Sequence, residues 1–317
     1  MTGGPLRVVF FGTPAFAVPT LEALLASPHQ VVGVVTQPDR PRGRGQRVSD
    51  APVKSRSLEA GIPVLQPVSL KPVEFLDELA GLDADLGVVA AYGRILTDAV
   101  LAIPRLGMIN VHASLLPRYR GAAPVHRAVI AGDRETGVTI MRVVKALDAG
   151  PMMATVRRPI DPNETSVDVE RDLARLGAAL LVDVVDQLAA GTASEIQQDD
   201  SGATYAPRLT KEDSPLDWSR PARHLHNQIR GLHPWPHADT FLQGRRLIVR
   251  TSALGEESGS AAPGTVVVAR GDQFDVATGD GVLRILELQA EGKKPMRARD
   301  FLTGHPVPAG SRFSAAP

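Results

Sequence analysis

Apolar residues in the first 190 positions alternate between short strand-like runs and segments with the spacing of a helix. Residues 7–12 (RVVFFG) are β-branched and aromatic, and Pro14 then opens a helical pattern over residues 16–25. A second run at 31–36 completes a β-α-β unit, which implies parallel pairing and a right-handed crossover. Further strand-like runs at 86–92, 107–112 and 137–143 are separated by helical patterns at 73–82 and 123–131. We therefore predict an α/β fold with an open, mostly parallel sheet.

The pattern changes after a long helical segment at 167–190, which Gly191 ends. Residues 191–208 are poor in apolar side chains and are predicted to be a linker. A helical pattern at 221–232 follows, and then five alternating segments at 240–242, 246–251, 265–270, 273–277 and 282–288. Five short strands at this spacing indicate a small C-terminal β-barrel, for which the oligonucleotide-binding type is one of several possibilities. The predicted domains are 1–190 and 209–317.

Composition narrows the classes of function. The 35 basic and 35 acidic residues cancel, so any contact with nucleic acid must come from local patches. The chain has no cysteine, which excludes disulfides, thiolate metal sites and cysteine nucleophiles and suits a cytoplasmic location. No apolar run approaches the roughly 18 residues of a membrane span, and no signal peptide is expected.

Common cofactor motifs are missing from the sequence. The first strand-to-helix turn, residues 12–16 (GTPAF), lacks the G-x-G-x-x-G pattern, and Pro14 removes one backbone amide that would bind a pyrophosphate. A nicotinamide or flavin cofactor is therefore not expected. His224 and His226 stand two apart near a predicted helix, which points them to different faces, so we interpret them as a surface pair and expect no metal.

The stretch 107–121 (GMINVHASLLPRYRG) carries the candidate chemistry. Asn110 and His112 are two apart at the carboxyl end of a predicted strand, so both side chains point to one face at the edge where open α/β sheets bind ligands. An asparagine amide can donate to a developing oxyanion while a histidine exchanges a proton beside it. The alternative is that Asn110 caps the next turn and His112 satisfies a backbone group.

Asp148, in the LDAG sequence at 147–150, follows the strand predicted at 137–143. A carboxylate on a neighbouring loop could reach His112 and fix its tautomer. The alternative is an ordinary turn aspartate before glycine.

Two basic segments are candidates for nucleic-acid contact. Residues 38–47 (PDRPRGRGQR) hold four arginines, Arg40, Arg42, Arg44 and Arg47, among glycines and prolines that disfavour helix and strand. We predict a mobile loop that presents guanidinium groups to phosphates, with a plain solvated loop as the alternative. A weaker cluster comprises Lys293 and Lys294, followed by Arg297 and Arg299.

Over nearly its whole length the chain resembles the methionyl-tRNA formyltransferase family. In the first half the resemblance is carried by FFGTPAFAVPTLEALL (10–25), TQPDRPRGRG (36–45), AYGRIL (91–96), INVHASLLPRYRGAAP (109–124), ETGVTIM (135–141) and LDAG (147–150). In the second half it is carried by YAPRLTKED (205–213), HNQIRGLHPWP (226–236) and GKKPMRARDFLTGH (292–305). It implies a Rossmann-like formyltransferase domain and an oligonucleotide-binding barrel that holds the acceptor arm of tRNA.

The resemblance also implies roles for individual residues. Asn110, His112 and Asp148 fall on the family's catalytic trio. The folate-binding segments fall on Ser114, Leu115, Leu116 and Pro117 and, lining the pterin pocket through the backbone, on Tyr92, Gly93 and Ile95. The arginine loop falls on the segment inserted at the acceptor end of tRNA, with Arg44 at the key position. Gln46 and residues 48–50 make the far side of this loop less basic than is common in the family.

The activity implied is transfer of the formyl group of 10-formyltetrahydrofolate to the α-amine of initiator methionyl-tRNA, for translation initiation, by an enzyme expected to be a monomer. One alternative is a formyltransferase that acts on a small amine, such as an amino sugar or glycinamide ribonucleotide. Another is a non-enzymatic RNA-binding protein whose α/β half is a degenerate scaffold.

Overall fold

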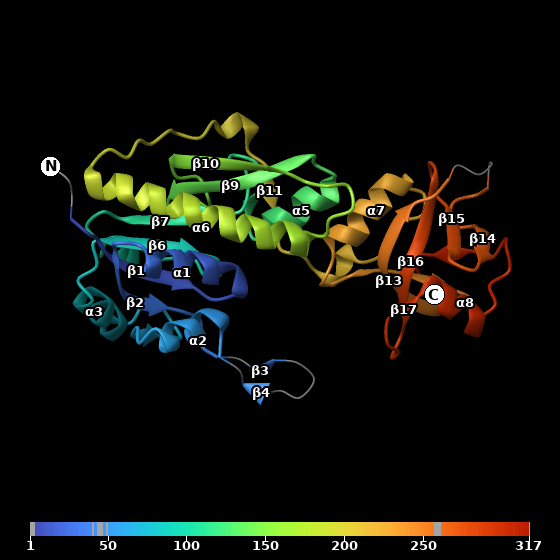
Figure 1. Cartoon of the computed structure of the whole chain (residues 1–317), viewed down its shortest axis with the longest axis horizontal. Coiled ribbons are helices and arrows are strands. Elements are labelled where there is room, and N and C mark those ends of the chain that lie inside the picture. The colour runs from blue at the N-terminus through green and yellow to red at the C-terminus, as the bar shows by residue number, and fades with distance from the viewer. Residues whose placement is uncertain (1–3, 40, 43–46, 49, 257–260, 317) are drawn as a thin grey trace. The chain divides into compact units, whose positions relative to one another are not determined.

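The computed structural model describes residues 4–39, 41–42, 47–48, 50–256 and 261–316 (Figure 1). The chain divides into two compact units. Unit 1 comprises Met1–Pro124, Thr136–Arg158 and Glu170–Ala206, and unit 2 comprises Val125–Glu135, Pro159–Val169 and Pro207–Pro317. Two short segments from the predicted N-terminal domain, 125–135 and 159–169, thus belong to the C-terminal unit.

The sheet of unit 1 has seven strands in the order β10-β9-β7-β6-β1-β2-β5. Pairing is parallel from β5 to β7 and antiparallel between β7 and β9, which confirms the predicted open, mostly parallel sheet. The strands are β1 (Arg7–Gly12), β2 (Gln30–Val35), β5 (Val64–Leu65), β6 (Leu86–Ala90), β7 (Met108–His112), β9 (Glu135–Arg142) and β10 (Met152–Pro159). The strand order reverses between β1 and β6, and such a switch point is where open α/β sheets form a ligand crevice at the carboxyl ends of their strands.

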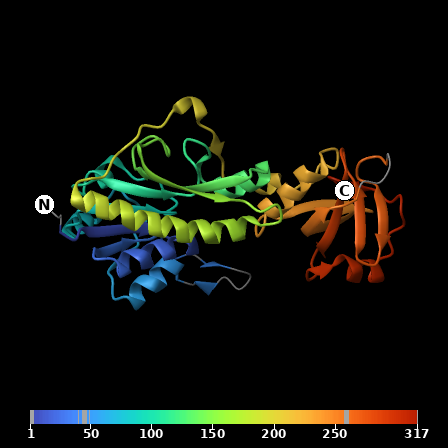
Figure 2. The same cartoon turned by 45° about the horizontal axis from the view of Figure 1, so that its top comes forward.

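Helices cover both faces of this sheet. They are α1 (Val18–Ala26), α2 (Pro52–Glu59), α3 (Val73–Gly81), α4 (Asp98–Leu101) and the long α6 (Ser166–Ala190), which runs along the sheet in both views (Figure 1 and Figure 2). A Cβ on Gly177 of α6 would lie only 2.8 Å from a methyl of Val111, so α6 packs closely on the face to which Val111 points. By strand alternation Asn110 and His112 point to the opposite face.

Unit 2 contains a curled antiparallel sheet in the order β14-β15-β16-β13-β12-β18, with β17 paired to β16. Its strands are β12 (Ala238–Leu242), β13 (Arg245–Leu254), β14 (Val266–Arg270), β15 (Gln273–Ala277), β16 (Val282–Ala290), β17 (Met296–Arg297) and β18 (Phe313–Ser314). Backbone bonds from Val266 to Ser311 and from Phe313 to Gly264, both 2.8 Å, join the two ends of this order. The predicted small barrel is thus confirmed, with β17 and β18 added to the five expected strands.

In the described part of unit 2 the sheet is accompanied by α5 (Pro124–Ala131), α7 (Ala222–Gly231) and α8 (Ala298–Gly304). His224 and His226 leave different faces of α7 as expected, but the expectation that both lie at the surface is wrong. His226 is 6% exposed, and its two ring nitrogens lie 3.0 Å from Ser252 Oγ and from the Pro162 carbonyl oxygen. Burial lowers the pKa of His226, because α7 packs this face against β13.

The segment 191–208 is ordered by short elements. Residue 196 forms a bridge with Met152, a turn of 3-10 helix spans η2 (Asp200–Gly202), and β11 (Tyr205–Ala206) pairs in parallel with β8 (Arg120–Gly121). Another such turn, η3 (Lys211–Asp213), follows in unit 2, and η1 (Ala15–Ala17) precedes α1. Within the described ranges, the helices are all too short or too polar to cross a membrane.

Candidate active site

Asn110 and His112 lie at the carboxyl end of β7, between β6 and β9. In the register Asn110 stands opposite Val89 of β6 and Met141 of β9. Asn110 is half-buried, and its side chain forms no hydrogen bond with any residue that the structure describes. Its amide is therefore available to donate to a bound molecule.

His112 is buried and held at one ring nitrogen. Nε2 lies 3.0 Å from the carbonyl oxygen of Tyr119, and because a carbonyl only accepts, Nε2 carries a proton. Nδ1 lies 3.7 Å from Oδ2 of Asp148. This separation is longer than a hydrogen bond but within the range of an ion pair, so Nδ1 is the nitrogen that faces the carboxylate.

Asp148 is fixed from its other side. Its Oδ2 accepts a hydrogen bond of 2.8 Å from the backbone N–H of Gly121, and its own backbone has a φ of +47°. The structure thus brings Asp148 next to His112. It does so although β9 is antiparallel to β7, so that the loop carrying Asp148 starts at the edge of the sheet where β7 begins. The alternative interpretation is that His112 satisfies a backbone group and Asn110 caps the next turn. The first part holds, since His112 bonds to the Tyr119 carbonyl. The turn-capping bond from Asn110 is not present in the described part of the chain.

The predicted folate segment after β7 is a turn tied to β9. Ser114 is fully buried, and its Oγ donates to the carbonyl of Arg118 at 2.7 Å. The hydroxyl of Thr139 donates to the Ser114 carbonyl at 2.8 Å and accepts from the Leu116 N–H at 3.2 Å. Leu116 is buried, whereas Leu115 and Pro117 are half-buried, so these last two side chains remain partly open to a ligand.

The segment after β6 places its three predicted residues differently. Tyr92 is 1% exposed and packs edge-to-face on Phe11, and burial raises the pKa of its hydroxyl, which has no hydrogen-bond partner among the described residues. Its carbonyl accepts from Gln37 Nε2 at 2.7 Å. Gly93, at φ +80°, leaves no room for a Cβ, which would lie 2.6 Å from that same nitrogen. Ile95 is 83% exposed.

These features fit a flat, partly apolar donor such as a reduced folate. Ile95 is exposed just beyond the carboxyl end of β6, and Leu147, beside Asp148, is 56% exposed. The two segments are linked by an ion pair of 3.4 Å between Lys145 and Asp98. Apolar side chains flanked by fixed backbone polar groups are typical of the sites that bind such ring systems.

Comparison with known proteins decides the family. Residues 6–185 match the family described as "Formyl transferase", and residues 208–306 match "Formyl transferase, C-terminal domain". The methionyl-tRNA formyltransferase of Methylococcus capsulatus is 47% identical over 308 residues, which cover 97% of this chain and 99% of that protein. That of Ectopseudomonas mendocina is 52% identical over 296 residues, covering 93% and 94%. The chain belongs to the methionyl-tRNA formyltransferase family.

Solved structures agree on the formyltransferase fold. WlaRD, described as a sugar 3N-formyl transferase, has a TM-score of 0.68 at 18% identity. The match covers 92% of this chain and 100% of WlaRD. A variant of HypX from Aquifex aeolicus has a TM-score of 0.65 at 15% identity, covering 95% of this chain and 48% of that one. At these identities the likeness concerns the fold alone. The predicted family and enzyme class are confirmed.

In this formyltransferase the arginine loop contains a short ladder. Arg40 and Arg44 lie outside the described residues, but β3 (Pro41–Arg42) and β4 (Arg47–Val48) pair in antiparallel fashion, with Arg42 opposite Arg47. The expectation that residues 38–47 form no strand is therefore wrong at Pro41, Arg42 and Arg47, because the two arms of the loop pair with each other.

The base of the arginine loop is held by an ion-pair cluster. Lys54 of α2 pairs with Asp39 before the ladder and, at 2.8 Å, with Asp50 after it. The hydrogen bond from Lys54 holds the pKa of Asp39 below its ordinary value. In unit 2, Lys293 and Lys294 are both exposed in the turn between β16 and β17.

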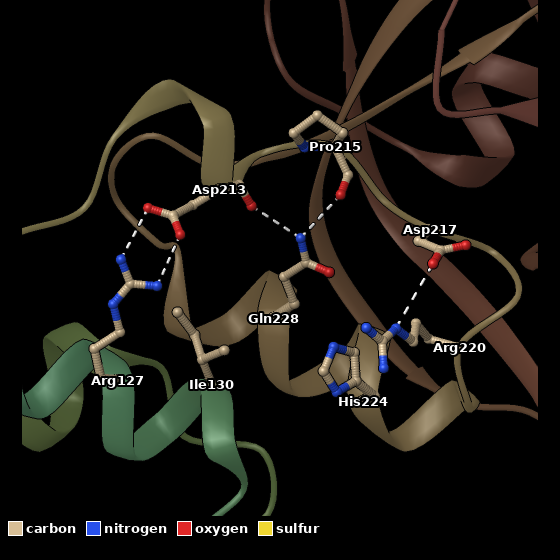
Figure 3. Close-up of a pocket in the computed structure, with 8 residues that line it drawn as sticks. All are labelled: Arg127, Ile130, Asp213, Pro215, Asp217, Arg220, His224 and Gln228. Carbon is tan, nitrogen blue, oxygen red and sulfur yellow. Dashed lines mark hydrogen bonds and ion pairs between the residues drawn. The ribbon is translucent and has the colours of Figure 1, made fainter. Parts of the chain in front are cut away.

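A polar pocket of unit 2 contains none of the predicted site residues (Figure 3). Arg127 of α5 pairs with both carboxylate oxygens of Asp213, at 2.7 and 3.0 Å. Gln228 of α7 donates to the carbonyls of Asp213 and Pro215, at 2.9 and 3.1 Å. These bonds join α5, α7 and the segment that enters unit 2, so we interpret this pocket as a structural joint.

Replacing Asp213 with alanine is expected to lower the free energy of unfolding by about 2 kcal/mol at pH 7, because the largely buried Arg127 loses its carboxylate and keeps only bonds to backbone carbonyls. Burial alone would raise the pKa of Asp213, but the hydrogen bonds from Arg127 and the Thr210 N–H hold it below its ordinary value. The stabilisation is therefore complete above about pH 4 and lost as the pH falls through the folded-state pKa. Urea denaturation at pH 7 and pH 3 checks this; an equal deficit at both would contradict it.

Sequence reasoning missed Gln198 of this formyltransferase. Its Nε2 donates to the carbonyl oxygens of Asp148 and Gly150, each at 2.8 Å. The residue lies in the predicted linker, one position after another glutamine, and no spacing or periodicity distinguishes the two. Only the fold shows which glutamine contacts the site.

Proposed function

We propose that this enzyme transfers the formyl group of 10-formyltetrahydrofolate to the α-amine of initiator methionyl-tRNA. The observation that carries the proposal is the arrangement at the end of β7. A buried imidazole is held between a carbonyl and a carboxylate, on the same sheet face as an asparagine amide that bonds to no described residue. The near-full-length likeness to methionyl-tRNA formyltransferases, through both domains, supports this choice of acceptor.

Asn110 acts on the formyl oxygen. When the amine attacks the formyl carbon, a carbon–nitrogen bond forms and negative charge develops on that oxygen. The Asn110 amide, already oriented by β7 and without a competing partner in the described structure, donates a hydrogen bond to this charge.

His112 and Asp148 manage the protons. The Nε2 proton of His112 is held by the Tyr119 carbonyl, so Nδ1 is the nitrogen that stabilises the oxyanion and gives a proton to the folate nitrogen as the old bond breaks. Asp148, whose Oδ2 lies 3.7 Å from Nδ1, orients the imidazole and receives the proton that the attacking amine releases, through a water where needed. The products are the formylated amine and tetrahydrofolate, and no electrons are exchanged.

The donor and the acceptor use different parts of the chain. The backbone of residues 92–95 and the turn of residues 114–117 bind the folate beside the crevice. The arginine loop, with Arg44, and the exposed Lys293 and Lys294 contact phosphates of the tRNA. The expectations that the enzyme is monomeric and cytoplasmic stay predictions.

Labelled formyl transfer tests this function. Purified protein is given 10-formyltetrahydrofolate and, in separate reactions, initiator methionyl-tRNA, elongator methionyl-tRNA, a nucleotide-linked amino sugar and glycinamide ribonucleotide. We expect rapid labelling of the initiator tRNA and little of the others. Preferred labelling of a small amine would replace the proposal with the small-amine alternative, and the absence of saturable folate binding would favour a non-enzymatic scaffold.

Replacing Arg44 with alanine is expected to weaken tRNA binding in a salt-dependent way and leave folate binding unchanged, because each phosphate contact releases counterions. The magnitude of the slope of log K against log salt should fall by about 0.7 to 0.9 for each phosphate that the variant no longer neutralises. Filter binding of initiator tRNA across a salt series measures this slope. An Arg44→Ala slope equal to that of the unmodified enzyme would mean that this arginine binds no phosphate.

A further inference from the structure

Residues 196–206, which we call the strap, pair with both chain segments that hold the candidate catalytic residues. At one end residue 196 exchanges two backbone hydrogen bonds of 2.8 Å with Met152, just after the loop of Asp148. At the other end β11 pairs with β8, just after Tyr119. The strap is so close to Gly121 that a Cβ there would lie 2.9 Å from a strap carbonyl, that of Ala206.

Gln198 is the contact between the strap and the loop of Asp148. Its Nε2 donates to the carbonyls of Asp148 and Gly150, and its Oε1 accepts from Arg120 at 2.8 and 3.1 Å. Arg120 is 4% exposed and is itself ion-paired at 2.6 Å with Asp200 of the strap. Both ends of the Gln198 amide are therefore used, so its orientation is fixed.

Thr204 is the contact between the strap and the residue that holds His112. The Thr204 hydroxyl accepts from the Tyr119 N–H at 2.9 Å, and the Tyr119 carbonyl accepts from His112. Tyr119 and Asp148 have φ values of +59° and +47°, a left-handed conformation that non-glycine residues adopt rarely. Such backbones persist where neighbouring groups fix them. The strap supplies one such group to each residue: the Thr204 hydroxyl bonds to the Tyr119 N–H, and Gln198 Nε2 bonds to the Asp148 carbonyl.

We propose that the strap is part of the active site and that Gln198 is a positioning residue, which sets the Asp148 carboxylate against His112. The inference rests on the proposed formyl transfer. The gap of 3.7 Å between Nδ1 and Oδ2 makes the position of this loop decisive, because a small displacement moves the carboxylate out of reach of the imidazole. Gln198 touches neither substrate and acts only through Asp148.

The test compares Gln198→Leu with Gln197→Leu in single-turnover transfer to initiator methionyl-tRNA at saturating donor. Gln197 is the matched control, since it is exposed on the same segment and its side chain bonds to no described residue. We expect Gln198→Leu to lower the rate by about 10²-fold, the order of loss that a misplacement of about 1 Å causes, with little change in the KM of either substrate. Gln197→Leu should retain the rate of the unmodified enzyme.

A double-mutant cycle separates positioning from general damage. In an Asp148→Asn background, Gln198→Leu should cause little further loss of rate, because the group that it positions is already disabled. Full additivity of the two losses would overturn the proposal. Thr204→Val, which removes a single hydroxyl, gives a second and independent variant if Gln198→Leu fails to fold, and we expect it to lower the rate while leaving KM unchanged.

The controls distinguish the inference from the proposed function. If the unmodified enzyme transfers formyl but Gln198→Leu and Thr204→Val are as fast as Gln197→Leu, the inference alone is wrong. If the unmodified enzyme transfers no formyl to any acceptor, the proposed function fails and the inference fails with it.

Discussion

Replacing His112 with alanine should lower the rate of formyl transfer by about 10² to 10⁴-fold, the range for losing a positioned acid–base group. The expected loss is large because the proposed mechanism gives the imidazole two tasks: it stabilises the charge on the formyl oxygen and supplies the proton for the departing folate nitrogen. In the unmodified enzyme Nε2 is held by the Tyr119 carbonyl at 3.0 Å, so both tasks fall to Nδ1, and alanine removes this nitrogen. Single-turnover kinetics with initiator methionyl-tRNA measures the effect.

Binding measurements complete the His112 experiment. The affinities of His112→Ala for initiator tRNA and for the folate donor should stay close to those of the unmodified enzyme, since the loss concerns the transition state. Thermal unfolding must be followed in parallel, because His112 is 5% exposed and its removal leaves a small cavity. A correctly folded His112→Ala enzyme with near-normal turnover would remove this residue from the active site.

Replacing Asn110 with alanine should lower the same rate by about 10² to 10³-fold, the usual result of removing one oxyanion donor. The amide makes no bond to the described residues, so its loss leaves no described protein group unpaired, and little change in stability is expected. The structure thus predicts a nearly pure catalytic defect, with kcat and kcat/KM reduced alike.

A second substitution sharpens the Asn110 prediction. Asn110→Asp keeps the shape of the side chain but places a negative oxygen at the position of the amide nitrogen, so its defect should be at least as large as that of Asn110→Ala. Asn163→Ala, at an exposed asparagine whose side chain bonds to no described residue, serves as the matched control and should be fully active. If Asn110→Asp were faster than Asn110→Ala, the oxyanion role would be wrong.

The sequence predicted those parts of the fold that have long, regular patterns. β1, β6 and β7 are apolar runs bounded by turns, and the helical spacing at 167–190 became α6 almost residue for residue. β5 has only two residues, too few for any periodicity. β10 is an edge strand with several exposed residues, so its apolar pattern is weak. The β3–β4 ladder depends on pairing between residues that are five to seven positions apart, which residue preference alone does not indicate.

The candidate site shows the same division. That Asn110 and His112 share one face of the sheet follows from strand alternation over two residues, which is a local pattern. The approach of Asp148 depends on a left-handed backbone at that residue and on a hydrogen bond from Gln198, 50 residues further along the chain. The burial of the Tyr92 side chain follows from packing on Phe11, a residue of another strand. Contacts of this kind are set by the tertiary fold and leave no local signal.

A crystal structure of the enzyme with a non-reactive analogue of 10-formyltetrahydrofolate tests the central claim most directly. We predict the pterin beside residues 92–95 and the formyl oxygen within about 3 Å of the Asn110 amide, with the His112 ring beside it. An analogue bound elsewhere, or a formyl group that neither Asn110 nor His112 contacts, would contradict the account.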